Sequence, residues 1–249
     1  MNGLKLKISE NFSKAAASYH DSALLQKDIA THLVKLAKPY VPGNARVLDL
    51  GSGTGFIADI LGQKIIQTDI AMGMCRKSHK ISPTICADME TLPFKNNSFD
   101  AVLSSSSVQW ANIQLALKEA CRVLDKNGCF IFSTFGYYTL ADIRSTFKLA
   151  NVENKIHEFL SRAEMENIIS ESGMKIESFD TEHLSGEFNS ISDLLWSIKE
   201  IGAGTGSKSE QPLTKEKLIL LEHIYRRNFN NEKIVANWEV FYFTCKKST

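Results

Sequence analysis

The stretch that decides the fold is residues 47–56, which read VLDLGSGTGF. A short apolar run surrounds an acid, Asp49, and three glycines follow at alternate positions, Gly51, Gly53 and Gly55. Glycine permits positive φ angles and lets a ligand approach where a Cβ atom would collide. The pattern therefore predicts a turn between a strand and a helix that presents bare backbone to a ligand.

The glycine spacing argues against a phosphate as that ligand. A P-loop requires lysine followed by serine or threonine after its last glycine, but Phe56 and Ile57 follow Gly55. A dinucleotide-binding loop that began at Gly51 would need glycine or alanine where Phe56 stands. A turn with a purely structural role, as in many α/β proteins, is the alternative.

Composition and charge limit the class of partner. The chain has 249 residues and is 43% hydrophobic, enough for one large domain over residues 1–249. Lysine and arginine (29) nearly balance aspartate and glutamate (28), so no net charge attracts the protein to nucleic acid or to a membrane. We expect a charged partner to meet a local patch instead.

Cysteine and histidine usage gives no sign of a disulfide framework or a metal site. The five cysteines form no Cys-x-x-Cys pair, and the six histidines are scattered. The start of the sequence lacks the apolar core of a signal peptide, and no apolar run reaches the length of about 18 residues that suggests a membrane span. We therefore expect reduced thiols, no bound metal and a cytoplasmic location.

Short β-type runs alternate with helical segments after residue 43. The expected strands are 45–50, 64–69, 83–88, 100–105 and 128–134, with helices at 56–61, 72–80 and 113–124 between them. Such alternation predicts an α/β fold with a doubly wound, mostly parallel sheet. Further helical patterns cover 139–150 and 161–172, and further strands are expected at 174–182 and 237–247.

Two segments stand outside this alternation. Residues 11–38 carry apolar residues at helical spacing and predict an N-terminal helical cap, which Pro39 ends. Residues 188–235 contain two helical patterns around GAGTGSKSEQP, a flexible run rich in glycine and serine. We expect this second segment to be a helical insertion.

Three acids follow successive predicted strands. Asp49, Asp69 and Asp88 each lie at or near a carboxyl end. Ligands of doubly wound sheets bind outside the carboxyl ends of the strands, so the three side chains should face one crevice. A single aspartate at such a position is usually a turn or cap residue, but three in series are harder to explain that way.

These features together resemble motif I of the class I methyltransferases, whose fold is Rossmann-like and whose cofactor is S-adenosylmethionine. The resemblance rests on Asp49-x-Gly51-x-Gly53-x-Gly55 and on Asp69, 20 residues after Asp49. It implies that Asp69 accepts hydrogen bonds from the ribose hydroxyls and that Asp88 accepts from the adenine amine. The backbone amide of Met89 would reach the adenine ring, and the remaining residues implied beside the cofactor are Ser52, Ile70 and Ser104.

Distant pieces of the chain resemble one branch of that family, the malonyl-acyl carrier protein O-methyltransferases of biotin synthesis. The pieces are FSKAAASYHDSALLQKDIATHLV (12–34), SVQW (107–110), LLWSIKEIGAG (194–204) and WEVFYF (238–243). The resemblance places Lys14 and Tyr19 near the methionyl end of the cofactor, with Gln26 on the same helical face. It also makes residues 188–235 a lid over the acceptor, which carries Ser197.

The residue that holds the acceptor's carboxylate is open at this stage. Some relatives have Arg-Phe before the helix that starts near Ser161, whereas this chain has His157-Glu158-Phe159. The candidate cations are Arg144, Arg162 and Lys199. Trp110 and Trp238 are the aromatic candidates for acceptor binding, and Trp238 with Asn237 replaces a common Thr-Tyr pair.

The implied activity is transfer of a methyl group from S-adenosylmethionine to the free carboxyl of malonyl-acyl carrier protein. A carboxylate is ionised near neutral pH, so the reaction requires no general base and no catalytic residue is assigned. Two alternatives exist, a methyltransferase for a quinone-type small molecule and a non-methylating assembly factor. Assembly factors of this kind have sequences similar to FDAVLSSSSVQW and FGYYTL.

Overall fold

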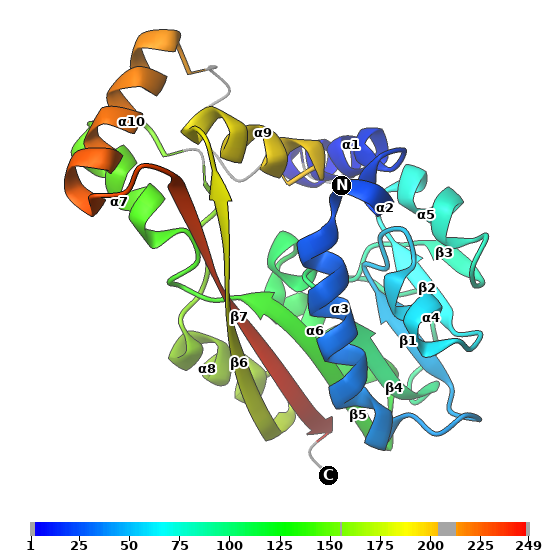
Figure 1. Ribbon diagram of the computed structural model, residues 1–249. Coiled ribbons are helices and arrows are strands. Elements are labelled where there is room, and N and C mark those ends of the chain that lie inside the picture. The colour runs from blue at the N-terminus through cyan, green and yellow to red at the C-terminus, as the bar shows by residue number, and fades with distance from the viewer. Residues whose placement is uncertain (1–2, 155, 204–212, 248–249) are drawn as a thin grey trace.

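The core of the protein is a seven-stranded sheet with helices on both faces (Figure 1). The computed structural model describes residues 3–154, 156–203 and 213–247. The strand order is β3-β2-β1-β4-β5-β7-β6, in which β1 to β5 run parallel and β7 lies antiparallel to both β5 and β6. This confirms the predicted doubly wound, mostly parallel α/β sheet. The strands are β1 (Val47–Leu50), β2 (Ile66–Asp69), β3 (Thr84–Cys86), β4 (Phe99–Ser104), β5 (Leu124–Phe135), β6 (Met174–Phe188) and β7 (Ile234–Lys247).

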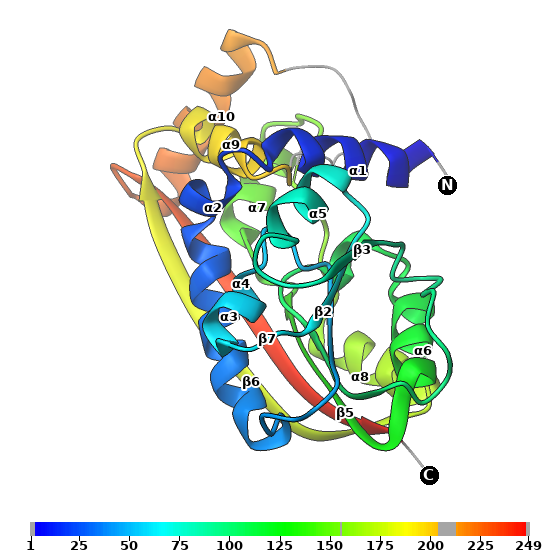
Figure 2. The same ribbon diagram turned by 90° about the vertical axis from the view of Figure 1, so that its right-hand side faces the viewer.

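Two helical layers cover the sheet because its strands are apolar on both sides. In β4, Val102 packs on one face, while Ala101 and Leu103 pack on the other. Helices α6 and α8 cover the first face and α3 and α4 the second, on opposite sides in Figure 2. The helices are α1 (Gly3–Ala15), α2 (Tyr19–Ser22), α3 (Leu24–Ala37), η1 (Lys38–Tyr40), α4 (Phe56–Leu61), α5 (Met72–Ser78), η2 (Val108–Trp110), α6 (Ile113–Val123), α7 (Ala141–Leu149), α8 (Arg162–Glu171), α9 (Ile191–Glu200) and α10 (Lys215–Phe229).

The order of the strands reverses between β1 and β4. After β1 the chain moves outward to β2 and β3, and then returns to form β4 on the other side of β1. Ligands of open α/β sheets bind at this switch point, outside the carboxyl ends of the strands. The glycine loop of residues 51–55 directly follows β1 and therefore lies at that position.

Strands β6 and β7 form a long antiparallel ribbon that extends beyond the rest of the sheet (Figure 1). The prediction ended β6 at residue 182, but pairing continues to Phe188, which lies opposite Ile234. The far half of the ribbon, with α7, α9 and α10, encloses a separate apolar cluster around Phe147, Leu194 and Tyr225. The insertion between β6 and β7 is therefore anchored by its own small core. Of the run GAGTGSKSEQP, residues 204–212 lie outside the described residues.

The first helix begins at Gly3, eight residues before the predicted segment. It crosses the carboxyl edge of the sheet between α5 and α9 (Figures 1 and 2). Gly73 of α5 allows close approach, because a Cβ atom there would collide with the backbone of Ser13. The first turns could not be predicted from the spacing of apolar residues, because Leu4 and Leu6 are exposed and of these three apolar residues only Ile8 is buried.

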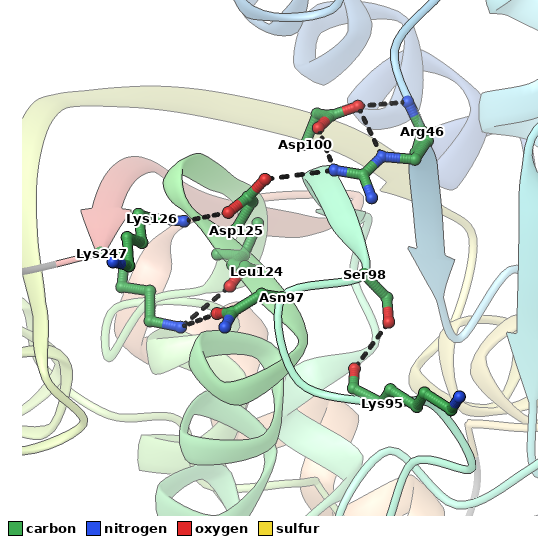
Figure 3. Close-up of polar contacts among 9 residues, drawn as sticks. All are labelled: Arg46, Lys95, Asn97, Ser98, Asp100, Leu124, Asp125, Lys126 and Lys247. Carbon is green, nitrogen blue, oxygen red and sulfur yellow. Dashed lines mark hydrogen bonds and ion pairs between the residues drawn. The ribbon is translucent and has the colours of Figure 1, made fainter.

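The opposite edge of the sheet carries a polar network (Figure 3). The side chain of Arg46, just before β1, donates to Asp100 Oδ1 at 2.6 Å and to Asp125 Oδ2 at 3.3 Å. Lys247 Nζ donates to Asn97 and to the carbonyl of Leu124, both at 2.9 Å. These contacts tie β1, β4, β5 and β7 together at the edge far from the glycine loop. Within the described part of the chain, no helix has the length and apolar character needed to cross a membrane.

Candidate functional site

The glycine loop adopts backbone conformations that explain its sequence. Gly51 and Gly53 have φ angles of +67° and +55°, in the left-handed region that favours glycine. A Cβ atom on Gly51 would collide with the side chain of Ser107, whereas one on Gly53 would meet only the ring of Tyr19 at 3.7 Å. The backbone of Gly53 therefore faces open space, where a ligand can approach it.

A cavity lies in front of this loop, and most of the predicted residues line it. Two adjoining hollows share Tyr19, Gly51 and Gly53. The larger hollow is also lined by the predicted residues Asp69, Ile70, Asp88, Met89 and Trp110, and the smaller one by Gln26, Asp49 and Ser52. The topology thus brings together eleven predicted residues from α2, α3 and the ends of β1 to β4.

Asp69 ends β2 and is held by the backbone on both sides. Its Oδ2 accepts from the Gly53 amide at 2.9 Å and its Oδ1 from the Ala71 amide at 2.8 Å. Burial raises the pKa of the Asp69 carboxyl to about 6, although these amide hydrogen bonds lower it in part. Each carboxylate oxygen has a second lone pair, so Asp69 can still accept hydrogen bonds from a ligand.

Asp49 is the most unusual group of the site. Its side chain is buried, and neither carboxylate oxygen has a hydrogen-bond partner among the described residues. Burial, together with the nearby charge of Asp69, raises the pKa of the Asp49 carboxyl to about 8, although the nearby Gln67 side chain lowers it in part. A buried acid without a partner is costly, and a cationic ligand in the cavity would relieve that cost.

Asp88 belongs to a small charged network that includes two residues missed by the sequence analysis. Its Oδ1 accepts from the Glu90 amide at 3.0 Å, and its Oδ2 lies 2.6 Å from Lys5 Nζ. Lys5 Nζ is also 2.6 Å from Glu90 Oε2. Lys5, Ile8 and Phe12 line the cavity at helical spacing, a pattern that was hidden because its first member is a lysine.

Aromatic rings enclose the end of the cavity near Tyr19. Phe12 contacts both Tyr19 and Trp110, with ring centroids 6.5 and 5.6 Å apart. Trp110 also contacts His157 at 5.1 Å, and His157 contacts Phe159 at 5.0 Å. Burial lowers the pKa of His157, which keeps this ring neutral near pH 7.

The other predicted cofactor residues lie outside both hollows. Ser104 is buried beneath the loop, where its hydroxyl donates to the Leu50 carbonyl at 2.8 Å. Gly55 precedes α4 with a φ of +98° and packs against Gln67 and Ile81. Lys14 is exposed in the last turn of α1. Ser104 and Gly55 therefore support the loop rather than line its cavity.

The candidate acceptor residues are dispersed. Arg144 donates to the carbonyls of Tyr137 and Thr139 and so organises the loop after β5. Arg162 pairs with Glu166 at 2.6 Å and covers the ring of Phe179, which places it in a groove away from the cavity. Two further acceptor candidates also lie apart from the cavity lining. Lys199 is exposed on α9, and Trp238 packs beside Phe188 in the ribbon.

Within the described residues, no group of three or more histidine, cysteine, aspartate or glutamate side chains is arranged to hold a metal ion. The chemistry of the cavity is instead that of buried carboxylates, bare backbone and aromatic walls. Such a surface suits a ligand that combines a cationic group, hydroxyls and an apolar ring.

Comparisons with known proteins agree with this geometry. The methyltransferase domain family matches residues 48–132, which run from β1 into β5. The chain is 30% identical to a malonyl-[acyl-carrier protein] O-methyltransferase of Gallionella capsiferriformans, over 96% of this chain and 89% of that protein. It is 32% identical to the biotin biosynthesis bifunctional protein BioHC of Cellvibrio japonicus, over 97% of this chain but only 50% of that protein.

The same architecture occurs in solved structures. A SAM-dependent methyltransferase from Thermotoga maritima superposes with a TM-score of 0.58 and 18% identity, over 97% of this chain and all of that one. At this level of identity the likeness establishes the fold alone. The cavity at the β1–β4 switch point is therefore built on a methyltransferase fold.

Proposed function

Because this chain belongs to the malonyl-[acyl-carrier protein] O-methyltransferase family, we propose that it methylates the free carboxyl of a malonyl thioester on acyl carrier protein. S-adenosylmethionine is the methyl donor. The product would be a methyl ester early in biotin synthesis. The observation that carries the proposal is the match along 96% of the chain, which includes the helices and ribbon outside the common methyltransferase core.

The cavity fits S-adenosylmethionine. Asp49, buried and without a partner among the described residues, would hold the ammonium of the methionyl group. Asp69 would accept from the ribose hydroxyls, while Asp88 and the Met89 amide would hold the adenine. The backbone of Gly53 leaves the room that this ligand needs, because a side chain there would fill the cavity.

The aromatic end of the cavity suits the transfer itself. The cofactor supplies an activated methyl group on a positively charged sulfonium. The rings of Tyr19, Phe12 and Trp110 offer π faces that favour a cation, and they exclude water from the same space. Burial and the charge of Asp69 raise the pKa of Tyr19, so its phenol stays protonated and forms a neutral wall.

The acceptor needs positioning rather than deprotonation. Its carboxylate has a pKa near 4 and is ionised at neutral pH, so the site requires no general base. This chain's task is to hold the carboxylate in line with the methyl group, which can contribute about 7 to 11 kcal/mol to a reaction between two bound partners. A quinone-type hydroxyl would instead need a base.

We further propose that residues 188–235 form a lid over the acceptor, as part of the same function. The support is that Gly202, just after α9, packs against Phe12 with a φ of +81°, so the insertion touches a wall of the cavity. For the acceptor's carboxylate we propose Arg144 or Lys199 as the cation, in preference to Arg162. Arg162 is disfavoured because it pairs with Glu166 and lines a groove that shares no residue with the cavity.

The proposal is tested with S-adenosylmethionine that carries a labelled methyl group and with purified malonyl-acyl carrier protein. We expect label to enter the carrier and to be released by mild alkali, because methyl esters are labile to base. A Gly53→Leu variant, in which a side chain fills the cavity, is the inactive control. Label that resists alkali, or no label despite tight cofactor binding, would contradict carboxyl methylation.

A further inference from the structure

Lys5, in the amino-terminal half of α1, joins that helix to two acids beside the cavity. Lys5 Nζ lies 2.6 Å from Asp88 Oδ2 and 2.6 Å from Glu90 Oε2. The side chains of Lys5, Asp88 and Glu90 are only 17%, 23% and 8% exposed. Pairs so shielded from water are screened less than surface pairs, and removal of one partner leaves a shielded charge unpaired, which is costly.

The acids of this network are also held by contacts that do not involve α1. Asp88 Oδ1 accepts from the Glu90 amide at 3.0 Å, and Glu90 Oε1 accepts from the Asn112 amide at 2.7 Å. Asn112 in turn caps α6 through its side chain. The carboxylates are therefore anchored to the body of the protein, and α1 is the part that can move away from them.

Two further contacts hold α1 near this end. Ile8 is buried, and Ser9 Oγ donates to the Ile70 carbonyl at 2.9 Å. Leu4 and Leu6 are exposed, so they contribute little to docking. Close packing begins only further along, where Ser13 meets Gly73. Loss of the ion pairs would therefore remove two of the contacts that hold the first two turns.

We infer that Lys5 is a positioning residue of the cofactor site, which orients Asp88 to accept from the adenine amine and latches α1 over the bound cofactor. This inference rests on the proposed function, because it takes the ligand of the cavity to be S-adenosylmethionine. Burial opposes the charge of Lys5, but its hydrogen bonds to Asp88 and Glu90 outweigh burial and raise its pKa. Lys5 is therefore charged near neutral pH.

The two ion pairs of Lys5 should affect how fast the cofactor dissociates as well as how tightly it binds. Ile8 and Phe12 line the cavity from the same face of α1 as Lys5, so this face forms one wall around the cofactor. The rate of dissociation should therefore depend on the two ion pairs.

The test compares Lys5→Met with Arg46→Met, which removes a cation that also pairs with two acids but at the opposite edge of the sheet (Figure 3). S-adenosylhomocysteine is the probe, and its dissociation rate is followed by stopped-flow fluorescence. We expect Lys5→Met to speed dissociation roughly tenfold or more, the effect of losing a charge-assisted hydrogen bond. Lys5→Arg should restore most of the wild-type rate, and Arg46→Met should leave it unchanged.

A double-mutant cycle separates positioning from a general loosening of the helix. If Lys5 acts through Asp88, the effects of Lys5→Met and Asp88→Asn should not multiply. The double variant should then release S-adenosylhomocysteine no faster than the single variant with the higher dissociation rate. Independent multiplication of the two effects would overturn the positioning role. Wild-type dissociation from a folded Lys5→Met protein would overturn the latch, whereas failure of the wild type to bind S-adenosylhomocysteine at all would overturn the proposed function instead.

Discussion

Binding of the cofactor should release a proton from Asp49. The pKa of this buried carboxyl is about 8, so at pH 7 the group is about nine-tenths protonated in the free protein. An ammonium in contact with it favours the ionised form and lowers the pKa. We therefore expect about 0.9 proton to be released for each cofactor bound at pH 7, and about 0.1 at pH 9.

Titration calorimetry in buffers of different ionisation enthalpy measures this release directly. The observed enthalpy should change with the buffer at pH 7, and much less at pH 9. Asp49→Asn keeps the shape of the side chain but has no proton to lose, so its enthalpy should be nearly independent of the buffer. Asp69, with a pKa of about 6, is mostly ionised at pH 7 and contributes little. Equal buffer dependence in the wild type and in Asp49→Asn would refute the assignment.

The same carboxyl sets a pH dependence of stability in the free protein. The pKa of Asp49 is higher in the folded state than its unfolded value of 3.8, so the folded state binds more protons. The contribution of Asp49 to stability should therefore fall as pH rises from about 4 to about 8, by roughly 5 kcal/mol. Thermal melts of the ligand-free wild type should show this fall, and Asp49→Asn should lack most of it. The same pH dependence of stability in the wild type and in Asp49→Asn would contradict the raised pKa of Asp49.

Three further outcomes are expected from the site. Asp69→Ala should weaken cofactor binding by roughly 1 to 3 kcal/mol in calorimetry, because it removes the ribose acceptors and frees the Gly53 amide; unchanged affinity would exclude Asp69 from the site. Gly53→Leu should abolish binding and destabilise the fold by about 1 to 3 kcal/mol, since its φ is +55°; a folded variant that binds normally would show that the cofactor lies elsewhere. The rate of methylation of the carrier protein should fall with added salt, as an acidic partner docked on local cations requires; a rate independent of salt would rule out electrostatic docking.

Local chemistry explains what could be predicted from the sequence. The glycine loop, Asp49 and Asp69 depend on a strand, a tight turn and a helix within 25 residues, so residue type and spacing were enough to place them. The doubly wound sheet followed from the same alternation. The strand bounds agreed closely wherever both faces of a strand are buried, as in β1 and β4.

Features that depend on long-range contacts could not be predicted from the sequence. Lys5 and Glu90 matter because α1 folds back over the loop after β3, a contact across more than 80 residues that no local pattern encodes. The outer half of β6 is half exposed and pairs only with β7, so its apolar signal is weak. The surroundings of the candidate cations also depend on side-chain partners that are distant in the sequence. Arg162, for example, lies in a separate groove.

The central claim is tested most directly by the mass of the carrier protein after incubation with the enzyme and S-adenosylmethionine. Only the malonyl thioester presents a free carboxylate, whereas the acetyl thioester presents none. We predict that malonyl-acyl carrier protein gains the mass of one methyl group and that acetyl-acyl carrier protein gains nothing. An unmodified malonyl carrier, under conditions in which the enzyme is saturated with cofactor, would contradict the proposed function.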